Sequence, residues 1–498
     1  MRKTALCLML LVCMGLLGGC SQMLEERPGA DMSVLVFAEQ MAAPEQDFAA
    51  EGTERVMLYF LSRDGARLEP VSREIALPGG VSPVRAALSA LLAGPLEGEE
   101  GTWPDLGLPI VARSLEISGG VAVVDLPARV RTLPQETLYA MRMAIANTLT
   151  EFSQVNHVSV LIGGREEGFD LAATMPVGAL TRTADMNVAA AYDHLEQIRQ
   201  SAGAFTQETV IYFPSEDGRF VLPIVRSIDY AQMTPIEYLY TLLEEMGDVG
   251  GSDLISRSLP APMLFIGEMP EIVRTEDGAY RAIEIQFEAA LDEALAAAGL
   301  SRGVYMAMLT HTLMGAVPGV EGLKVHIGDD VLTSLSAEQT PDLQPLVFAQ
   351  TLATREDFTS YIGAPVIVYA IAEQGGLTRE RRILAQARQR EARALLGVLL
   401  SMWGDRQELA ALTDEDILAV GVEGNEMALD LSADFASALR ALPEDEAKAA
   451  VYAIVNTLTE GSHSGGVSFY FEGEQMSQPL GLLEMRGRLA RNPGLVVD

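Results

Sequence analysis

The sequence predicts an α+β fold repeated in three tandem domains, each a mixed β-sheet with two helices packed on one face. The first observation behind this prediction is a helix-ending motif, Asn147-Thr-Leu-Thr-Glu-Phe152, followed by the apolar run 158–163. The motif returns as Asn456-Thr-Leu-Thr-Glu460 and, in altered form, as His311-Thr-Leu-Met-Gly315. Self-similarity of this kind indicates one structural unit that has been used several times.

The second observation is the hairpin that opens each unit. Val56 to Leu61 is a short apolar run rich in β-forming residues, Asp64-Gly65 is a turn signal, and a second strand leads through Arg73. The second unit repeats these residue types without a gap, and the matched pairs are Tyr59 and Tyr212, Asp64 and Asp217, Gly65 and Gly218, Pro70 and Pro223, and Arg73 and Arg226. The third unit keeps Tyr369 and Arg382.

The third observation is a helix after each hairpin. Thr234 to Glu237 carries the residues of a capping box, with proline at the first helical position. Corresponding helices are expected between Pro83 and Gly94 and over 387–400. A second hairpin, a second helix and a closing strand follow, and the second unit inserts an extra helix over 288–298. The predicted order in each unit is therefore β-β-α-β-β-α-β.

These elements divide the chain into consecutive segments. The expected segments are a lipoprotein signal peptide (1–19), a lipid anchor and tether (20–53), domain one (54–168), a linker with a helix (169–207), a divergent domain two (208–331), a linker (332–363), domain three (364–475) and a C-terminal tail (476–498).

The N-terminal segment has the features of a bacterial export signal. Arg2 and Lys3 precede an apolar run from Ala5 to Leu17, which is shorter than the roughly 20 residues of a membrane-spanning helix. The run ends in Leu17-Gly-Gly-Cys20, which resembles the lipobox of bacterial lipoproteins, where the cysteine becomes the lipidated N-terminus. The sequence therefore predicts a protein held by acyl chains, such as palmitate, on the extracytoplasmic face of the cell membrane. The alternative is an ordinary secretion signal.

Cysteine content and charge exclude several kinds of site and partner. All three cysteines lie at or before Cys20, so the processed chain can form neither an internal disulfide nor a cysteine metal site. The formal net charge is −34. Such a chain is repelled by nucleic acid and by anionic headgroups, so the membrane is expected as a partner only through the lipid.

Unit one resembles the GerMN domain of GerM-type sporulation and germination lipoproteins. The resemblance rests on Tyr59-Phe60, Arg73, Leu91-Leu-Ala-Gly-Pro95, Asp125-Leu126, Asn147 to Phe152 and Val158 to Gly163. Unit three keeps most of this pattern without the Gly-Pro. Unit two departs from it, with Gln286-Phe287 in place of Asp-Leu and His311 in place of the asparagine.

The resemblance implies an envelope scaffold or assembly factor in spore formation or germination, without catalytic activity. It also implies that envelope proteins or further copies of the chain are the partners. A module that binds a wall component or regulates a membrane-bound sensor is the alternative. A wall hydrolase is the weakest hypothesis, because nothing singles out a pair of catalytic carboxylates.

The residues that could carry chemistry support this interpretation. No two of the five histidines have metal-ligand spacing, and no nucleophile motif or phosphate loop is present in the sequence. The acidic groups Asp414-Glu-Asp416 and Glu444-Asp-Glu446 are expected to cap helices instead of binding calcium, because carboxylates favour helix N-termini. Neither a cofactor nor a metal is predicted.

The best candidates for a site are polar residues that recur between the units. They are Arg73, Asn147, Thr148 and Glu151 in unit one, Arg226 in unit two, and Arg382, Asn456, Thr457 and Glu460 in unit three. One hypothesis groups Arg73 with Asn147, Thr148 and Glu151 in a hydrogen-bonded pocket or partner contact. The other, which we favour, is structural: the Asn and Thr side chains bond a nearby turn, and Arg73 pairs with a local carboxylate.

Overall fold

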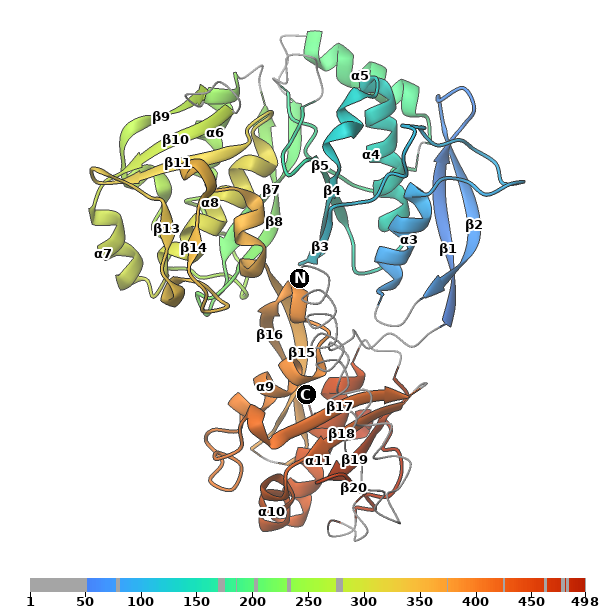
Figure 1. Ribbon diagram of the computed structural model, residues 1–498, viewed down its shortest axis with the longest axis vertical. Helices are drawn as coiled ribbons and strands as arrows, with labels where there is room; N and C mark the ends of the chain where they lie inside the picture. The colour runs from blue at the N-terminus through green and yellow to red at the C-terminus, as the bar shows by residue number, and fades with distance from the viewer. Residues whose placement is uncertain are drawn as a thin grey trace, which may run out of the picture.

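The computed structural model describes residues 52–77, 81–168, 175–184, 186–200, 205–230, 234–274, 281–373, 375–423, 426–460, 464–475, 480 and 483–497. The predicted signal peptide, the lipidated Cys20 and most of the predicted tether lie outside the described residues. Figure 1 shows units one and two side by side, with unit three below them.

Unit one follows the predicted order of elements. Its elements are β1 (Gly52–Leu61), β2 (Leu68–Leu77), α3 (Pro83–Leu92), β3 (Ser114–Ser118), β4 (Val121–Leu126), α4 (Gln135–Leu149) and β5 (His157–Ile162). β4 and β5 pair in parallel, with Val124 opposite Val160, because the α4 crossover returns the chain to the same edge of the sheet. A short strand, β6 (Ala179–Leu180), extends this sheet.

Unit two has the same order with the extra helix that the sequence predicts. Its elements are β7 (Phe205–Pro214), β8 (Val221–Tyr230), α6 (Pro235–Glu245), β9 (Ile266–Arg274), β10 (Arg281–Phe287), α7 (Ala290–Ala297), α8 (Arg302–Ala316), β11 (Gly322–Ile327) and β12 (Asp330–Val331). The capping box between Thr234 and Glu237 is present at the start of α6.

Unit three has this order with one further helix, over 433–441, that the sequence analysis did not predict. Its elements are β15 (Gly363–Ile371), β16 (Leu377–Ala385), α9 (Ala392–Ser401), β17 (Ile417–Glu423), β18 (Glu426–Leu431), α10 (Ala433–Ala441), α11 (Glu444–Thr459), β19 (Val467–Phe471) and β20 (Glu474–Gln475). Of the two acidic groups, Glu444-Asp-Glu446 opens α11 as predicted. Asp414–Asp416 forms a three-residue 3-10 turn capped by Thr413 that leads directly into β17, so no longer helix begins there.

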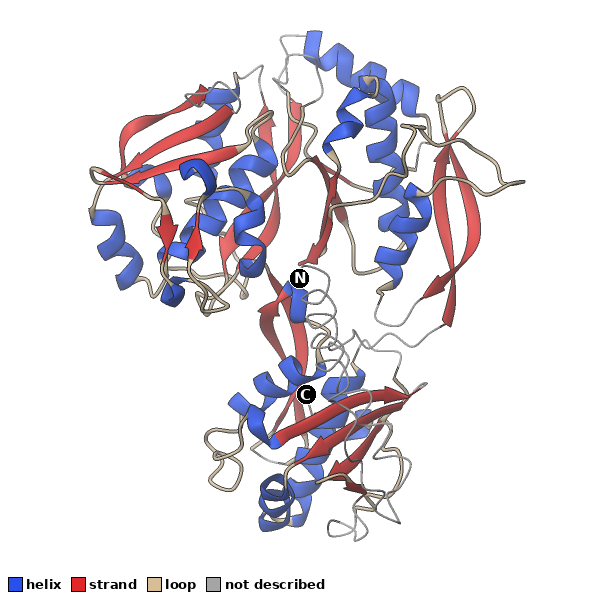
Figure 2. Cartoon of the chain, viewed as in Figure 1, coloured by secondary structure: helices blue, strands red, loops and turns tan. Residues whose placement is uncertain are grey.

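The α+β class is confirmed, but the strands of each unit form two sheets instead of one. The opening hairpin is a separate two-stranded sheet, and the later strands form a mixed four-stranded sheet. Helices connect the two sheets, since α4 packs against both β1 and β5. Figure 2 shows the same separation of the hairpins from the mixed sheets.

The segments predicted as linker and tail are packed onto the units. Residues 332–363 contain β13 (Ser334–Leu335), β14 (Leu346–Val347) and the 3-10 segment η5 (Arg355–Tyr361), which packs against α8. The final residues return to unit three, where Val496 bridges to Leu377. The predicted helix after unit one is α5 (Val188–Gln200).

The hydrophobic core is continuous between units one and two. One buried cluster joins Tyr59, Leu61 and Val123 of unit one to side chains of unit two such as Tyr212 and Leu309. A second cluster fills the rest of unit one. Unit three has its own core around Trp403, Leu429 and Ile454. We therefore expect units one and two to behave as one body, with unit three attached by a smaller surface.

Candidate functional site

Each unit joins the end of its second helix to its opening strand through a threonine. The hydroxyl of this threonine accepts a hydrogen bond from the backbone N–H of the strand tyrosine. The three bonds are Tyr59 to Thr148 at 3.1 Å, Tyr212 to Thr312 at 2.9 Å and Tyr369 to Thr457 at 3.0 Å. The threonines are buried, so each bond satisfies a donor that has no access to water.

In unit one the tyrosine hydroxyl belongs to a cluster of three side chains. Tyr59 donates to the Glu151 carboxylate at 2.5 Å, and Arg182 donates to the Tyr59 hydroxyl at 3.1 Å and pairs with Glu151. Burial and the adjacent carboxylate raise the pKa of Tyr59 above its usual value, although Arg182 opposes them. The phenol therefore stays protonated and acts as a hydrogen-bond donor.

Unit three repeats this cluster with equivalent residues. Tyr369 donates to Glu460 at 2.9 Å, and Arg491 contacts both of them while its guanidinium carbon lies 5.5 Å from the centre of the Tyr369 ring. Arg379 pairs with the same carboxylate at 2.8 Å from the neighbouring strand. The cation–π contact and the Arg491–Glu460 ion pair hold the C-terminal segment against the sheet, whereas the Arg379–Glu460 pair joins β16 to the end of α11.

Unit two lacks this carboxylate on its own helix, because Gly315 occupies the position of Glu151 and Glu460. The carboxylate comes from unit one instead. Glu116 of β3 lies 3.1 Å from the Arg355 guanidinium and accepts from the Tyr212 hydroxyl at 3.4 Å. Arg355 also donates to Tyr212 at 3.3 Å. The cluster of unit two is therefore completed across the boundary between the units.

Burial dominates the electrostatics of this shared cluster. It raises the pKa of the Glu116 carboxyl despite the attraction of Arg355, and raises the pKa of Tyr212 to about 12. A buried ion pair adds little net stability compared with apolar packing, but removing one partner leaves a buried charge without compensation. We infer that the Glu116–Arg355 pair mainly sets the relative orientation of units one and two and adds little to the stability of either unit.

In each unit, the residue before this threonine forms a hydrogen bond with the backbone of the segment that follows the closing strand. Asn147 accepts from the backbone N–H of Thr183 at 3.3 Å. Asn456 bonds both backbone groups of Asn492, at 2.9 and 3.1 Å. In unit two, His311 lies 3.1 Å from the Phe358 carbonyl.

His311 can perform this role as a neutral side chain. Burial, together with the charge of Arg355, lowers its pKa well below the usual value, so the imidazole is uncharged near neutral pH. A carbonyl only accepts, so Nε2 carries the proton and donates to Phe358. The asparagine-to-histidine change that sets unit two apart therefore keeps the contact.

The structure does not bring Arg73 to the group of Asn147, Thr148 and Glu151, so that part of the pocket hypothesis is wrong. Tyr59 and Phe60 are neighbours on β1 and point to opposite faces. Glu151 bonds Tyr59, whereas Arg73 lies 5.2 Å from the centre of the Phe60 ring. The sequence does not show that Arg73 packs on one face of β1 and Glu151 on the other, so it could not exclude the grouping of the two.

The three repeated arginines have different partners. Arg73 donates to the Gly94 carbonyl at 3.1 Å and pairs with Glu99, which holds the loop after α3. Arg226 donates to the Asp248 carbonyl at 3.1 Å in the corresponding loop of unit two. Arg382 is half-exposed and pairs with Glu380 on its own strand.

The sequence interpretation missed the arginines of the clusters and Glu116. One signal was available: Arg182 follows Glu151 by 31 residues, and Arg491 follows Glu460 by the same spacing. No comparable signal marks Glu116, because its role depends on how two units pack together.

The clusters are suited to holding segments together and lack the parts of a catalytic site. Nucleophilic catalysis needs an activated nucleophile beside a base. In these clusters the tyrosines are protonated donors, the carboxylates are paired with arginine, and His311 is committed to a carbonyl. Among the described residues no group of histidine, cysteine, aspartate and glutamate could hold a metal ion.

Comparison with protein families identifies the domain type of two of the repeated units. A family described as "Germane: Sporulation and spore germination" matches residues 57–168 and 367–477. This chain contains two Germane domains. The two matched Germane segments coincide with units one and three, and unit two repeats their order of elements. The family description assigns the domain to sporulation and spore germination and names no enzymatic activity.

Two solved structures are similar to the Germane chain. The tandem GerMN domains of the sporulation protein GerM from Bacillus subtilis align with 18% identity and a TM-score of 0.22, covering 61% of this chain and 99% of theirs. The first GerMN domain of the same protein aligns with 23% identity and a TM-score of 0.19, covering 27% of this chain and 97% of its own. Among curated proteins, none matches the Germane chain.

Proposed function

We propose that this chain is a non-catalytic lipoprotein of the cell envelope, which acts as an interaction or assembly scaffold in spore formation or germination. Cys20 would carry the lipid, and envelope proteins or further copies of the chain would be its partners. The export signal and the Leu-Gly-Gly-Cys motif support the location. In the part of the chain that the structure describes, no helix has the length and apolar character needed to cross a membrane.

The observation that carries the scaffold proposal is the fixed contact between units. Beyond the Glu116–Arg355 pair, the backbone N–H of Glu166 in unit one donates to the Met314 carbonyl of unit two at 3.0 Å. Gly319 of unit two donates in return to the Glu166 carbonyl at 2.8 Å. A body held in this way presents surfaces from several units in one orientation, as an assembly platform requires.

Unit three joins the same body through β15. The Ser118 hydroxyl of unit one donates to the Gly363 carbonyl at 2.6 Å, and Ile362 forms a parallel bridge to Val221 of unit two. The two residues at the junction of the segment 332–363 and β15 thus contact both other units. Because these contacts restrict the motion of the three units relative to one another, we infer that a partner would bind a surface formed by more than one unit.

Affinity capture with the intact chain tests the scaffold. We expect specific envelope proteins, or further copies of the chain, to be recovered, and to be lost when Arg355→Ala loosens units one and two. The Glu97→Gln variant is the matched control, since Glu97 is exposed on unit one. Retention by purified wall, with no protein partner, would favour the alternative of a wall-binding module. Recovery that is unchanged in Arg355→Ala would contradict the need for a fixed body.

A further inference from the structure

The three units line a partly open cavity of about 800 Å³ where they meet. Its walls come from β3 and the start of α3 in unit one, from β8 and the loop after α6 in unit two, and from β15 and β16 with the segment after them in unit three. Ligand sites in proteins commonly have volumes of about 300 to 1,000 Å³ and lie between domains. The cavity therefore has the size and position of a binding site.

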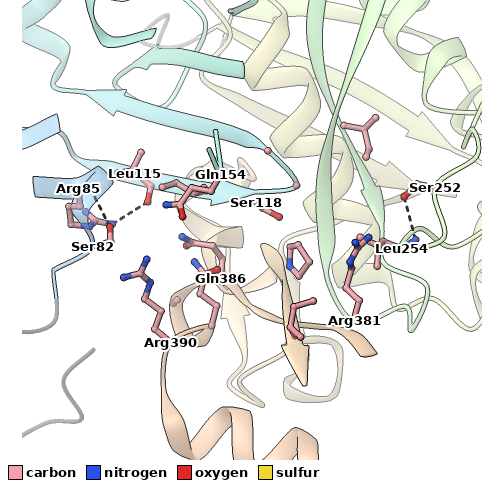
Figure 3. Close-up of a pocket in the computed structure, with 18 residues that line it drawn as sticks. Ser82, Arg85, Leu115, Ser118, Gln154, Ser252, Leu254, Arg381, Gln386 and Arg390 are labelled. Atoms are coloured by element: carbon pink, nitrogen blue, oxygen red, sulfur yellow. Dashed lines mark hydrogen bonds between the residues drawn. The ribbon is translucent and has the colours of Figure 1, made fainter. Parts of the chain in front are cut away.

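The charge of this cavity is opposite to that of the whole chain. Arg85, Arg381 and Arg390 line it, and no aspartate or glutamate is among its described lining residues. The chain as a whole carries a formal net charge of −34. Figure 3 shows Arg85 and Arg390 at one end and Arg381 at the other, with Gln154 and Gln386 between them. A positive cavity in an acidic protein selects anionic ligands.

Two of the arginines keep donors for a ligand. Arg85 is exposed and donates to the Leu115 carbonyl at 3.1 Å, which leaves most of its guanidinium N–H groups available. Arg381 is also exposed, and its side chain forms no ion pair or hydrogen bond with any residue that the structure describes. The planar guanidinium group binds a carboxylate through two parallel hydrogen bonds.

The remaining lining residues favour a peptide over other anions. Gln154, Gln386 and Gln389 supply amides that both donate and accept, as a peptide backbone requires. Leu115, Ile224 and Ile367 provide apolar walls for side chains. No aromatic residue is among the described lining residues, so the cavity lacks the platform on which a sugar ring would stack. A polyphosphate would leave the apolar walls unused.

We propose that this cavity binds an acidic peptide segment of a partner protein, whose carboxylates pair with Arg85 and Arg381. The three units each contribute part of the wall, so occupancy would also depend on their fixed arrangement. This binding site goes beyond the proposed scaffold function, because it could exist whether or not the chain assembles a larger complex.

The test measures binding of the purified whole chain to two arrays of six-residue peptides. Each peptide in the first array has two glutamates separated by apolar residues, and the second array has glutamine at those positions. We expect members of the first array to bind about tenfold or more tightly than their glutamine counterparts, and Arg381→Gln to remove most of this difference. Equal binding to both arrays would overturn the proposal.

Arg382→Gln is the matched control for Arg381→Gln. The two residues are neighbours on β16, both are exposed, and only Arg381 lines the cavity. Binding should be unchanged in Arg382→Gln, and an equal loss in both variants would contradict a specific site. Inorganic polyphosphate serves as a competitor: displacement as strong as that by free glutamate peptide would show a general anion site and overturn the peptide assignment. The assay uses purified components, so its failure is distinguishable from failure of the scaffold proposal.

Discussion

At the scale of single residues, Arg355 is a buried side chain that joins units one and two, beside their shared core and the backbone bonds of Glu166. Its side chain is 6% exposed, lies against Glu116 and Tyr212, and donates to the His311 carbonyl at 2.7 Å. Sequence patterns identified Asn147, Thr148 and Glu151 because they recur in unit three. They could not identify Arg355, because its partner Glu116 belongs to another unit and has no counterpart in the repeat.

Replacing Arg355 should destabilise the chain strongly. Arg355→Ala leaves the buried carboxylate of Glu116 without its cation, and breaking a buried ion pair in this way costs about 3–5 kcal/mol. Arg379→Ala removes the half-exposed partner of Glu460 and should cost less than about 1 kcal/mol. Equilibrium unfolding in urea measures both variants. Equal free energies of unfolding in the two variants would show that the shared cluster has no special role.

Arg73 gives a second prediction at this scale, one that depends on pH. Hydrogen bonding from Arg73 lowers the pKa of Glu99. A carboxyl with a lowered pKa in the folded chain stabilises the fold above its unfolded pKa, and this contribution is lost as the pH falls through the folded pKa.

Arg73→Ala should therefore reduce stability at pH 7, on the order of 2 kcal/mol, because charged hydrogen bonds to the loop are lost. The variant should also lose less stability as the pH falls, because Glu99 no longer has the hydrogen bonds from Arg73 that lower its pKa in the folded chain. Thermal unfolding at pH values from 7 downward checks both effects. If folding were unaffected at every pH while a protein partner was lost, Arg73 would be a binding residue instead.

At the scale of elements, the segment after each closing strand is tied to the end of the second helix. In unit three this tie is Asn456, which is fully buried and bonds both backbone groups of Asn492. The helices and strands were predictable because their apolar periodicity repeats. The sequence predicts a linker over 332–363 and a tail over 476–498. Residues 332–363 and the described residues 483–497 instead pack onto the units, which the sequence does not show because irregular turns have no such period.

Removing this tie should release the C-terminal segment. Asn456→Ala leaves the N–H and carbonyl of Asn492 without partners, which costs about 1–3 kcal/mol. Hydrogen exchange over 483–497 should accelerate, while exchange in α9 stays slow. Ser437→Ala is the control, because the Ser437 hydroxyl bonds only its own helix at Ala433. Unchanged exchange over 483–497 in Asn456→Ala would mean that other contacts hold the segment.

At the scale of the whole molecule, the arrangement of the units follows from contacts that no single unit contains. The order of the elements in each unit was largely predictable from internal similarity. The continuous core between units one and two was not, because an apolar residue such as Val123 has the same sequence signature whether it faces its own unit or another. The arrangement of the three units determines which surfaces are accessible to a partner protein.

The distance between units one and two tests the central claim most directly. A chain that begins after Cys20 contains no cysteine, so spin labels can be placed at Glu97→Cys in unit one and Asp253→Cys in unit two. Both positions are exposed. Electron paramagnetic resonance should give one narrow distance distribution, preserved in Arg379→Ala and broadened in Arg355→Ala. A distribution that is already broad in the unsubstituted background would contradict a fixed body.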